Sequence, residues 1–288
     1  FRLIKGWTVD DNIQAPDAAK LAVHWFESKQ NEVAAEVADL FSKYRLSEAL
    51  MAVYKLFWDE FSSWYLEMIK PAYGQGIDRT TYDATLCFLD NLLHLLHPFM
   101  PFITEELWQQ MYERNAEEGE SLMVSALSMD TYVDTAFVAQ FEVVKGVISN
   151  IRSIRLQKNI AQKEPLDLQV LGENPVAEFN AVIQKMCNLS SITVVESKAE
   201  GASSFMVGTT EYAVPLGNMI DVEAEIARME AELKHKEGFL QGVLKKLSNE
   251  KFVNNAPAAV LEMERKKQAD AESIISSLKE SIAALKKA

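Results

Sequence analysis

One short stretch of the chain concentrates positive charge without any acid. Residues 145–163 contain Lys145, Arg152, Arg155, Lys158 and Lys163, and no Asp or Glu. In a helix, Lys145, Arg152 and Arg155 follow at i, i+7 and i+10, so we expect them to share one stripe opposite the Ile and Val side chains. Such a stripe pairs with phosphates or stacks on unpaired bases. A solvated helix face with cations near its C-terminal end is the alternative interpretation.

A second group of basic residues flanks a predicted turn near the C-terminus. Its members are Lys245, Lys246, Lys251, Arg265, Lys266 and Lys267. Antiparallel pairing brings the residues before and after the turn to the same level, where they could meet phosphates of a nucleic acid. Phe252 near the turn either stacks on a base or packs against the turn. The alternative is a set of ordinary charged surface positions of a coiled coil.

No combination of residues predicts catalysis or metal binding in this chain. His94 and His97 lie near Cys87 on one apolar predicted helix. Because no second ligand pair exists, packed or hydrogen-bonded histidines are favoured over a metal site. The 11 glycines form no phosphate-binding loop. We therefore expect no catalytic residue, no metal and no cofactor in this chain.

Five predicted helices position the first basic group. They begin at Pro16, Ser47, Asp78, Thr104 and about Thr135. Pro16 fits a first helical turn, and Ser47, Asp78 and Thr104 are good N-cap residues. The second helix carries a wide apolar stripe, in which we expect Leu50, Val53, Tyr54, Phe57, Phe61, Trp64, Tyr65 and Met68 to be buried. The pattern predicts an antiparallel helical bundle over residues 1–158.

Residues 159–218 have a different pattern. Alternating apolar residues predict short strands at Leu166–Gly172, Ser191–Glu196 and, around a turn, Ser204–Gly217. A helix from Asn174 to about Asn188 separates the first two. We expect a small α/β connector with a sheet of three or four strands.

Residues 219–288 show a heptad pattern of apolar residues on both sides of a polar stretch near Pro257. Two helices of about thirty residues, each rising about 1.5 Å per residue, predict an antiparallel two-helix coiled-coil arm roughly 45 Å long. Glu264 and Gln268 make the second helix polar close to the turn, so we expect the tip to be the least stable part. The predicted fold class is mainly α.

The charge of the chain is unevenly distributed. Its 42 acidic and 29 basic residues give a net charge of −13, which excludes a uniformly cationic nucleic-acid binder. Residues 1–120 hold 20 acids and 10 bases, whereas residues 221–288 hold 12 of each. No apolar run is long enough to span a membrane. Cys87 and Cys187 suit a reducing compartment, so we expect a cytoplasmic protein.

Two strings in the predicted bundle are long and rich in rare residues. They are VYKLFWDEFSSWYLEMIKP (Val53–Pro71) and HPFMPFITEELWQ (His97–Gln109). Both resemble the anticodon-binding helical domain of class I aminoacyl-tRNA synthetases, most closely the valine, leucine and isoleucine subgroup. KLSNEKFVNNAPAAVLEMERKK (Lys246–Lys267) resembles the C-terminal coiled-coil arm of the valyl-tRNA synthetase family in particular.

The resemblance implies a function for the chain and for the longer protein to which it would belong. The chain, which starts at Phe1, is expected to be a fragment of a bacterial synthetase that attaches valine to tRNA(Val), with ATP and magnesium bound by an absent upstream catalytic domain. The resemblance also implies that IRSIR (Ile151–Arg155) lies at the edge of the anticodon domain and that the arm contacts the outer corner of the tRNA. The fragment itself is expected to be inactive, with no DNA or membrane partner and a monomeric parent. KMCNLS (Lys185–Ser190) lacks the second lysine of the KMSKS loop and lies in the wrong domain.

Two alternatives remain open. A helical scaffold whose coiled coil dimerises or binds a partner helix would also fit the acidic composition. The equivalent region of an isoleucyl- or leucyl-tRNA synthetase would share the bundle, but those relatives do not end in this arm.

Overall fold

In a computed structural model the chain divides into two compact units, Phe1–Pro215 and Leu216–Ala288. The structure describes residues 1–111, 121–127, 129–216, 222–248, 261–265, 267, 268, 271, 272, 275 and 279. It is mainly α-helical with a small sheet, as the sequence predicts. The helical bundle and the α/β connector, which we expected to be separate domains, lie within the first unit.

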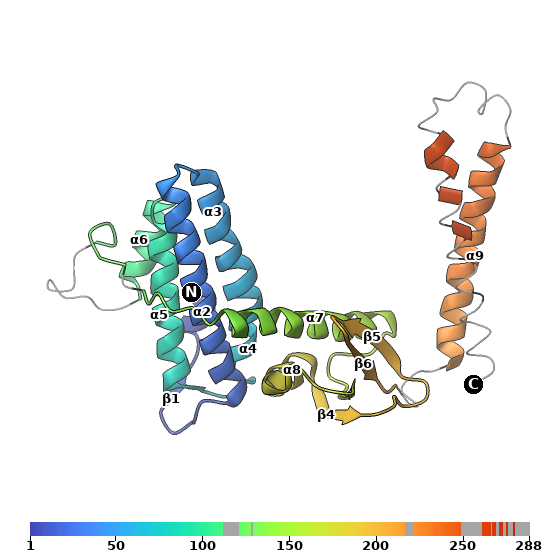
Figure 1. Ribbon diagram of the computed structural model, residues 1–288, viewed down its shortest axis with the longest axis horizontal. Helices are drawn as coiled ribbons and strands as arrows, with labels where there is room; N and C mark the ends of the chain where they lie inside the picture. The colour runs from blue at the N-terminus through green and yellow to red at the C-terminus, as the bar shows by residue number, and fades with distance from the viewer. Residues whose placement is uncertain are drawn as a thin grey trace. The chain divides into compact units, whose positions relative to one another are not determined.

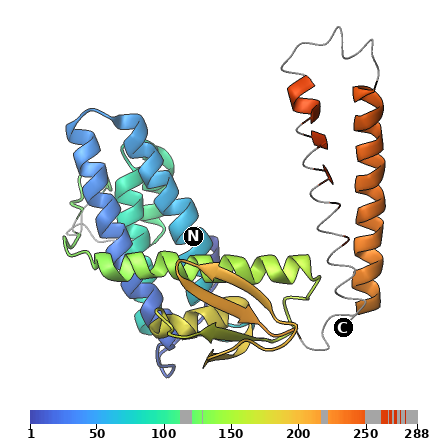
Figure 2. The ribbon, with the colours of Figure 1, turned by 45° about the vertical axis from the view of Figure 1, so that its right-hand side comes forward.

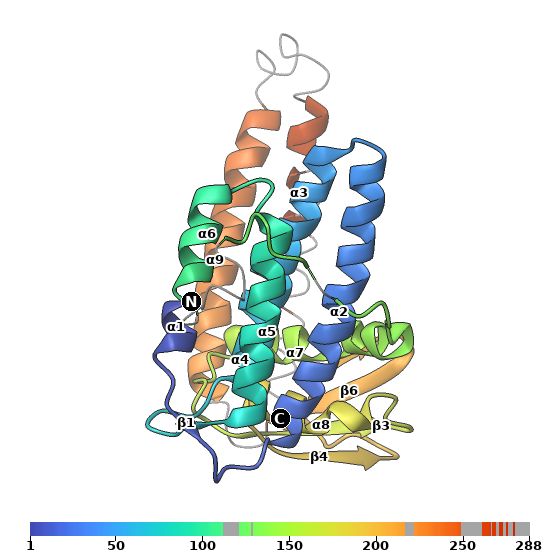
Figure 3. The same ribbon diagram turned by 90° about the vertical axis from the view of Figure 1, so that its left-hand side faces the viewer.

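The bundle is built from helices that run alongside one another (Figures 1 and 3). Their bounds are α1 (Arg2–Lys5), α2 (Asp17–Ser42), α3 (Leu46–Lys55), η1 (Leu56–Tyr65), α4 (Leu66–Ile69), α5 (Arg79–Leu96) and α6 (Pro101–Gln109). A parallel bridge between β1 (Val9–Asp10) and β2 (Ile77–Asp78) ties down the N-terminal segment. The core is aromatic, with Phe26 within 5.0–5.2 Å of the rings of Phe61, Tyr65 and Phe88. Large buried rings of this kind supply much of a bundle's hydrophobic stabilisation.

The predicted second helix is continuous from Leu46 to Ile69, but its middle part, η1, is a π-helix. Val53, Phe61, Tyr65 and Met68 are buried as predicted. The prediction was wrong for Leu50 and Tyr54, which are 39% and 53% exposed. α3 turns Ala49 and Val53 toward α2 instead. The small side chain of Ala49 allows that close approach, and a stripe of large apolar residues does not indicate it.

The starts of α5 and α6 differ in how well the predicted N-cap residues agree with the structure. Asp78 caps α5 as predicted, accepting a hydrogen bond from the Thr81 amide at 2.8 Å. Thr104 does not cap α6, because the helix already begins at Pro101, whose fixed φ suits a first turn. The Thr104 hydroxyl instead donates to the Met100 carbonyl at 2.8 Å inside the helix.

Helix α7 (Thr135–Gln157) has the predicted bounds and crosses the bundle helices (Figures 1 and 2). Its apolar stripe is fully buried at Val144, Val147, Ile148 and Ile151. The carboxylate of Asp134 caps it, and the hydrogen bond from the Phe137 amide holds the pKa of that carboxyl below its usual range.

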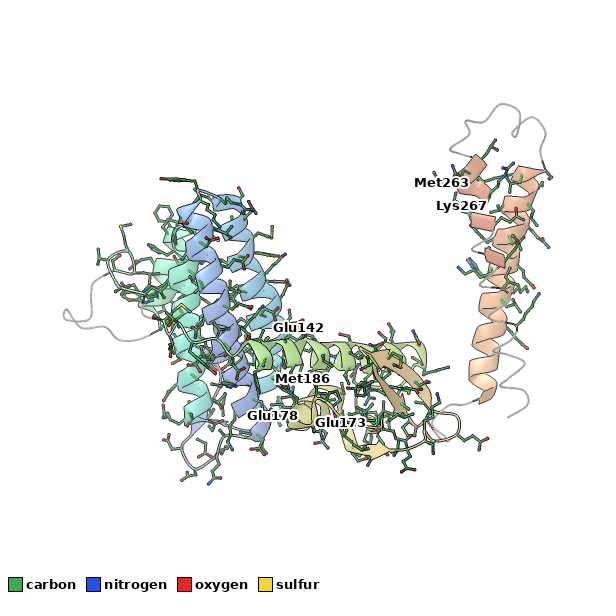
Figure 4. All side chains as sticks on the ribbon, viewed as in Figure 1. Glu142, Glu173, Glu178, Met186, Met263 and Lys267 are labelled. Carbon is green, nitrogen blue, oxygen red and sulfur yellow. The ribbon has the colours of Figure 1, made fainter. Side chains whose placement is uncertain are left out.

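A single ammonium group fastens α7 to the bundle. Lys145 Nζ lies 2.6 Å from Glu60 of η1 and 2.8 Å from Glu142 of α7 itself. It also lies 5.2 Å from the ring centroid of Trp25 in α2 and 5.8 Å from that of Trp64 in η1. Glu142 lies in the part of α7 that crosses the bundle (Figure 4). Because the Lys145 and Glu60 side chains are only 13% and 17% exposed, solvent screens their attraction weakly.

The α/β connector is a four-stranded sheet with one helix. Its strands are β3 (Leu166–Leu171), β4 (Leu189–Val195), β5 (Ser203–Val207) and β6 (Thr210–Val214), in the order β4-β3-β6-β5. β3 and β4 are parallel, and the other two pairs are antiparallel. The short helix η2 (Ala177–Phe179) and α8 (Asn180–Cys187) connect β3 to β4. The predicted strands are confirmed, and the predicted helix is present, but it begins at Asn180 after the short helix η2 and not at Asn174.

The connector shares its core with the bundle. Phe179 lies 4.7 Å from Phe137 and 5.7 Å from Phe141 of α7, ring centroid to ring centroid. On the same helix, Gly146 admits β5, since a Cβ there would lie 3.0 Å from Val207 Cγ1. These contacts fix α7 between the two parts and explain why they form one unit.

The second unit contains α9 (Val222–Leu247) and, after it, the described residues between Leu261 and Lys279. Met263 and Lys267 lie on the segment that runs beside α9 (Figure 4). Two ion pairs join this segment to α9, with nitrogen–oxygen distances of 2.9 Å for Lys279–Glu237 and 3.8 Å for Lys246–Glu264. Val243 and Ala271 are buried.

The contact of Lys145 predicts a stability change. Lys145→Met keeps the aliphatic stem but leaves the half-buried Glu60 carboxylate without its partner, so the free energy of unfolding should fall by about 2 kcal/mol in a urea titration. The matched control Lys20→Met removes an exposed pair with Asp17 and should cost less than about 1 kcal/mol. Equal losses in the two variants would show that Lys145 does not fasten α7.

Candidate nucleic-acid interface

The structure separates the basic residues that the sequence placed on one exposed stripe of α7. Lys145 is enclosed by carboxylates and aromatic rings, as described above, and Arg155 is 1% exposed. The prediction of an exposed stripe of three cations is therefore wrong for Lys145 and Arg155. Arg152 is exposed, and Lys158, the residue that follows α7, is half-buried. RNA contact through Arg152 and Lys158 stays a prediction.

Arg155 binds backbone carbonyls of the connector. Its Nη1 donates to the Ala161 carbonyl at 2.9 Å, and its Nη2 donates to the Cys187 and Asn188 carbonyls at 2.7 and 3.2 Å. The last two belong to the C-terminal end of α8, where the helix dipole favours a cation. Burial lowers the pKa of the Arg155 guanidinium and raises the pKa of the Cys187 thiol to about 12. Arg155 thus holds α7, the following loop and α8 together.

Arg152 is the cation of α7 best placed to meet a ligand. Its guanidinium carbon lies 5.6 Å from the centroid of the Trp64 indole. An arginine held over an aromatic ring keeps its donors available for a phosphate or its outer face for a base. Trp64 is 88 positions from Arg152 along the sequence, so no local spacing could predict the contact between the two side chains. The apolar stripe of the sequence predicts Trp64 in the core, whereas its side chain is half-buried.

The loop after α7 is held in one shape. The Ile160 amide donates to the Arg155 carbonyl at 2.8 Å, and Asn188 Nδ2 donates to the carbonyls of Gln162 and Lys163 at 3.1 and 3.0 Å. Lys163 is exposed at the end of this loop. The C-terminal end of α7 and its loop therefore present Arg152 and Lys163 on a rigid support, with Lys158 between them in the sequence.

The basic residues predicted for the arm are only partly described. Lys245 and Lys246 are exposed in the last turn of α9, and Arg265 and Lys267 are exposed on the following helical segment. Lys251, Phe252 and Lys266 lie outside the described residues.

A buried carboxylate connects two of these lysines. Glu264 is 6% exposed, and its oxygens lie 2.8 Å from Lys267 Nζ and 3.8 Å from Lys246 Nζ. Hydrogen bonding to Lys267 and the nearby charge of both lysines lower the pKa of Glu264. Through Glu264 the pairing brings Lys246 and Lys267 close together in the second unit.

The histidines are hydrogen-bonded, as predicted. His94 Nε2 lies 2.8 Å from Ser125 Oγ, and His97 Nδ1 lies 2.7 Å from Thr104 Oγ1. Within the part of the chain that the structure describes, no group of three His, Cys, Asp or Glu side chains could hold a metal. Every helix within those residues is too short or too polar to cross a membrane.

Comparison with known proteins agrees with this arrangement. Residues 23–170 match the family model of the anticodon-binding domain of tRNA ligase. Residues 221–286 match the model of the valyl tRNA synthetase tRNA binding arm. The first match covers α2 through β3, including Arg152 and its loop, and the second covers α9 and the residues after it.

Several valine–tRNA ligases are similar over almost the whole chain. The protein from Bacteroides thetaiotaomicron is 99% identical over 288 residues, which are 100% of this chain and 33% of that protein. The protein from Phocaeicola vulgatus is 72% identical over 287 residues, 100% of this chain and 32% of its own length. The protein from Enterococcus faecalis is 34% identical over 296 residues, 98% of this chain and 33% of its own length.

The chain spans about a third of the length of the curated relatives it matches. The family match to the anticodon-binding domain alone covers more than half of the chain, and it includes the helices that carry Arg152 and Trp64. The chain therefore belongs to the family of anticodon-binding domains of tRNA ligases, and its C-terminal segment matches the tRNA binding arm of the valyl type.

Proposed function

We propose that this chain is the tRNA-binding part of a valine–tRNA ligase and positions tRNA(Val) for the attachment of valine. The observation that supports it most directly is the presence of both matched segments, anticodon-binding domain and valyl-type arm, in one chain. The chemistry belongs to the rest of the ligase, where ATP and magnesium are expected. This chain catalyses nothing by itself, and its contribution is binding.

The proposed mechanism is a grip at two places on one tRNA. The C-terminal end of α7, with Arg152 and Lys158, holds the anticodon side. The second unit acts as an antiparallel coiled-coil arm that holds the outer corner of the tRNA through cations such as Lys245, Lys246, Arg265 and Lys267. Two linked contacts raise the effective concentration of the second and restrict the orientation of the acceptor end.

The charge distribution supports selective binding over general RNA binding. The bundle is acidic, and Lys145 and Arg155 are already engaged by protein groups. Like charges repel RNA that approaches the bundle elsewhere, whereas the exposed cations attract it locally. We propose that the ligase acts as a cytoplasmic monomer, with no DNA or membrane partner.

Two exposed apolar side chains on α9 favour a second candidate function, in which the arm binds a partner helix or a second copy. Phe239 and Leu244 are 47% and 41% exposed. A dimer that forms with rising concentration, and that is lost on removal of residues 221–288, would support this alternative.

Charge reversal at Arg152 tests the anticodon side. Arg152→Glu should weaken binding of a tRNA with the valine anticodon about tenfold at moderate salt. It should also lower the slope of log affinity against log salt by about 1, because one phosphate contact is lost. The matched control Lys20→Glu reverses an exposed cation at the start of α2. If both variants bind like the unaltered chain across a salt titration, Arg152 does not contact the RNA.

Removal of the arm tests the second contact. In a full-length ligase carrying this chain, deleting residues 221–288 should raise KM for tRNA by about tenfold or more, because the linked contact is lost. Valine activation, measured by pyrophosphate exchange, should hardly change. A comparable loss of activation would contradict a role limited to tRNA binding.

A further inference from the structure

A groove lies at the C-terminal end of α7, beside the proposed anticodon contact. Its lining residues are Arg155, Leu156, Asn159, Ile160, Ala161 and Gln162. Its volume is about 380 Å³, within the range of roughly 300–1,000 Å³ that is common for small-molecule sites. All of these residues come from the last turn of α7 and the loop that follows it.

The groove has one apolar wall. Leu156 is 82% exposed, although it directly follows the buried Arg155, and Ile160 beside it is half-buried. A single exposed leucine is ordinary on a protein surface. Here it borders a cavity, so a flat apolar ligand could cover it on one side.

The other wall is polar and rigid. Asn159 and Gln162 are exposed, and their side-chain amides both donate and accept hydrogen bonds, as the edges of nucleobases do. Asn159 holds the left-handed region with φ 53°, a conformation that asparagine tolerates better than most residues. Hydrogen bonds from the Arg155 and Asn188 side chains to backbone carbonyls hold the loop, so binding a ligand costs little conformational entropy.

The charge around the groove suits an anionic ligand. The exposed Arg152 and Lys163 flank the groove in the chain, and one acid, Glu164, follows Lys163 and acts electrostatically on Arg155, so two cations stand against one carboxylate. A different groove between α2 and α3 has three carboxylates, Glu36, Glu48 and Glu60, against two ammonium groups, so it disfavours RNA.

We propose that the groove after α7 receives one unpaired base of the bound tRNA. The face of the base covers Leu156, its edge meets the amides of Asn159 and Gln162, and the adjoining phosphates lie near Arg152 and Lys163. This inference rests on the proposed function, because it assigns a base to the same RNA-binding surface. Unstacked loop bases are what proteins read in single-stranded RNA.

A double-mutant cycle tests the proposal with the 288-residue chain and a tRNA carrying the valine anticodon. Leu156→Ala should weaken binding about five- to tenfold, within the range seen for loss of one base contact. The salt slope should be unchanged, because no charge is removed. The matched control Val194→Ala truncates an exposed apolar residue, 57% exposed on β4, and should bind like the unaltered chain.

Single abasic sites placed along the anticodon loop complete the cycle. At one position the abasic RNA should bind equally to the unaltered chain and to Leu156→Ala, because each change removes the same contact. If Leu156→Ala binds normally while Arg152→Glu is weakened, the base subsite is wrong and the proposed function stands. If neither variant is weakened, both the base subsite and the proposed RNA contact of Arg152 are wrong. An effect of Leu156→Ala that no abasic position abolishes also overturns the base assignment.

Discussion

Helix α7 is held against the bundle by its buried apolar stripe and by one ammonium group that is only 13% exposed. Lys145 joins α2, η1 and α7 through two carboxylates and the faces of two tryptophans. Because α7 also packs on the connector through Phe137 and Phe141, whatever holds α7 against the bundle also places the connector. The loop with the base groove is attached to the last turn of α7, so its position follows from the same contact.

Cations on one helix serve different purposes according to what packs beside them. Lys145 meets acids of the bundle, and Arg155 meets the C-terminal carbonyls of α8, where a positive charge is favourable. Arg152 lies over the face of Trp64, and it remains exposed. An acidic protein can therefore bind RNA locally, because a few exposed cations matter more than the net charge of −13.

Sequence patterns predicted the elements well because those signals are local. The cap at Asp78, the bounds of α7 and the strands of the connector follow from spacing within a few residues. The roles of Lys145 and Arg155 could not be predicted, because Glu60 is 85 positions from Lys145 and Cys187 is 32 positions from Arg155. The resemblance to a known family predicted the family, which the match to the anticodon-binding domain confirms, but no spacing indicated which cations the fold would bury.

Arg152 is proposed to meet the tRNA, whereas Arg155 holds α7, its loop and α8 together. Arginine-selective labelling with phenylglyoxal, read by mass spectrometry with and without a tRNA carrying the valine anticodon, tests both halves at once. Arg152 should react in the free chain and be protected by the tRNA, and Arg155 should stay unreactive in both states. A reactive Arg155 that the tRNA protects, with Arg152 labelled equally in both states, would contradict the account.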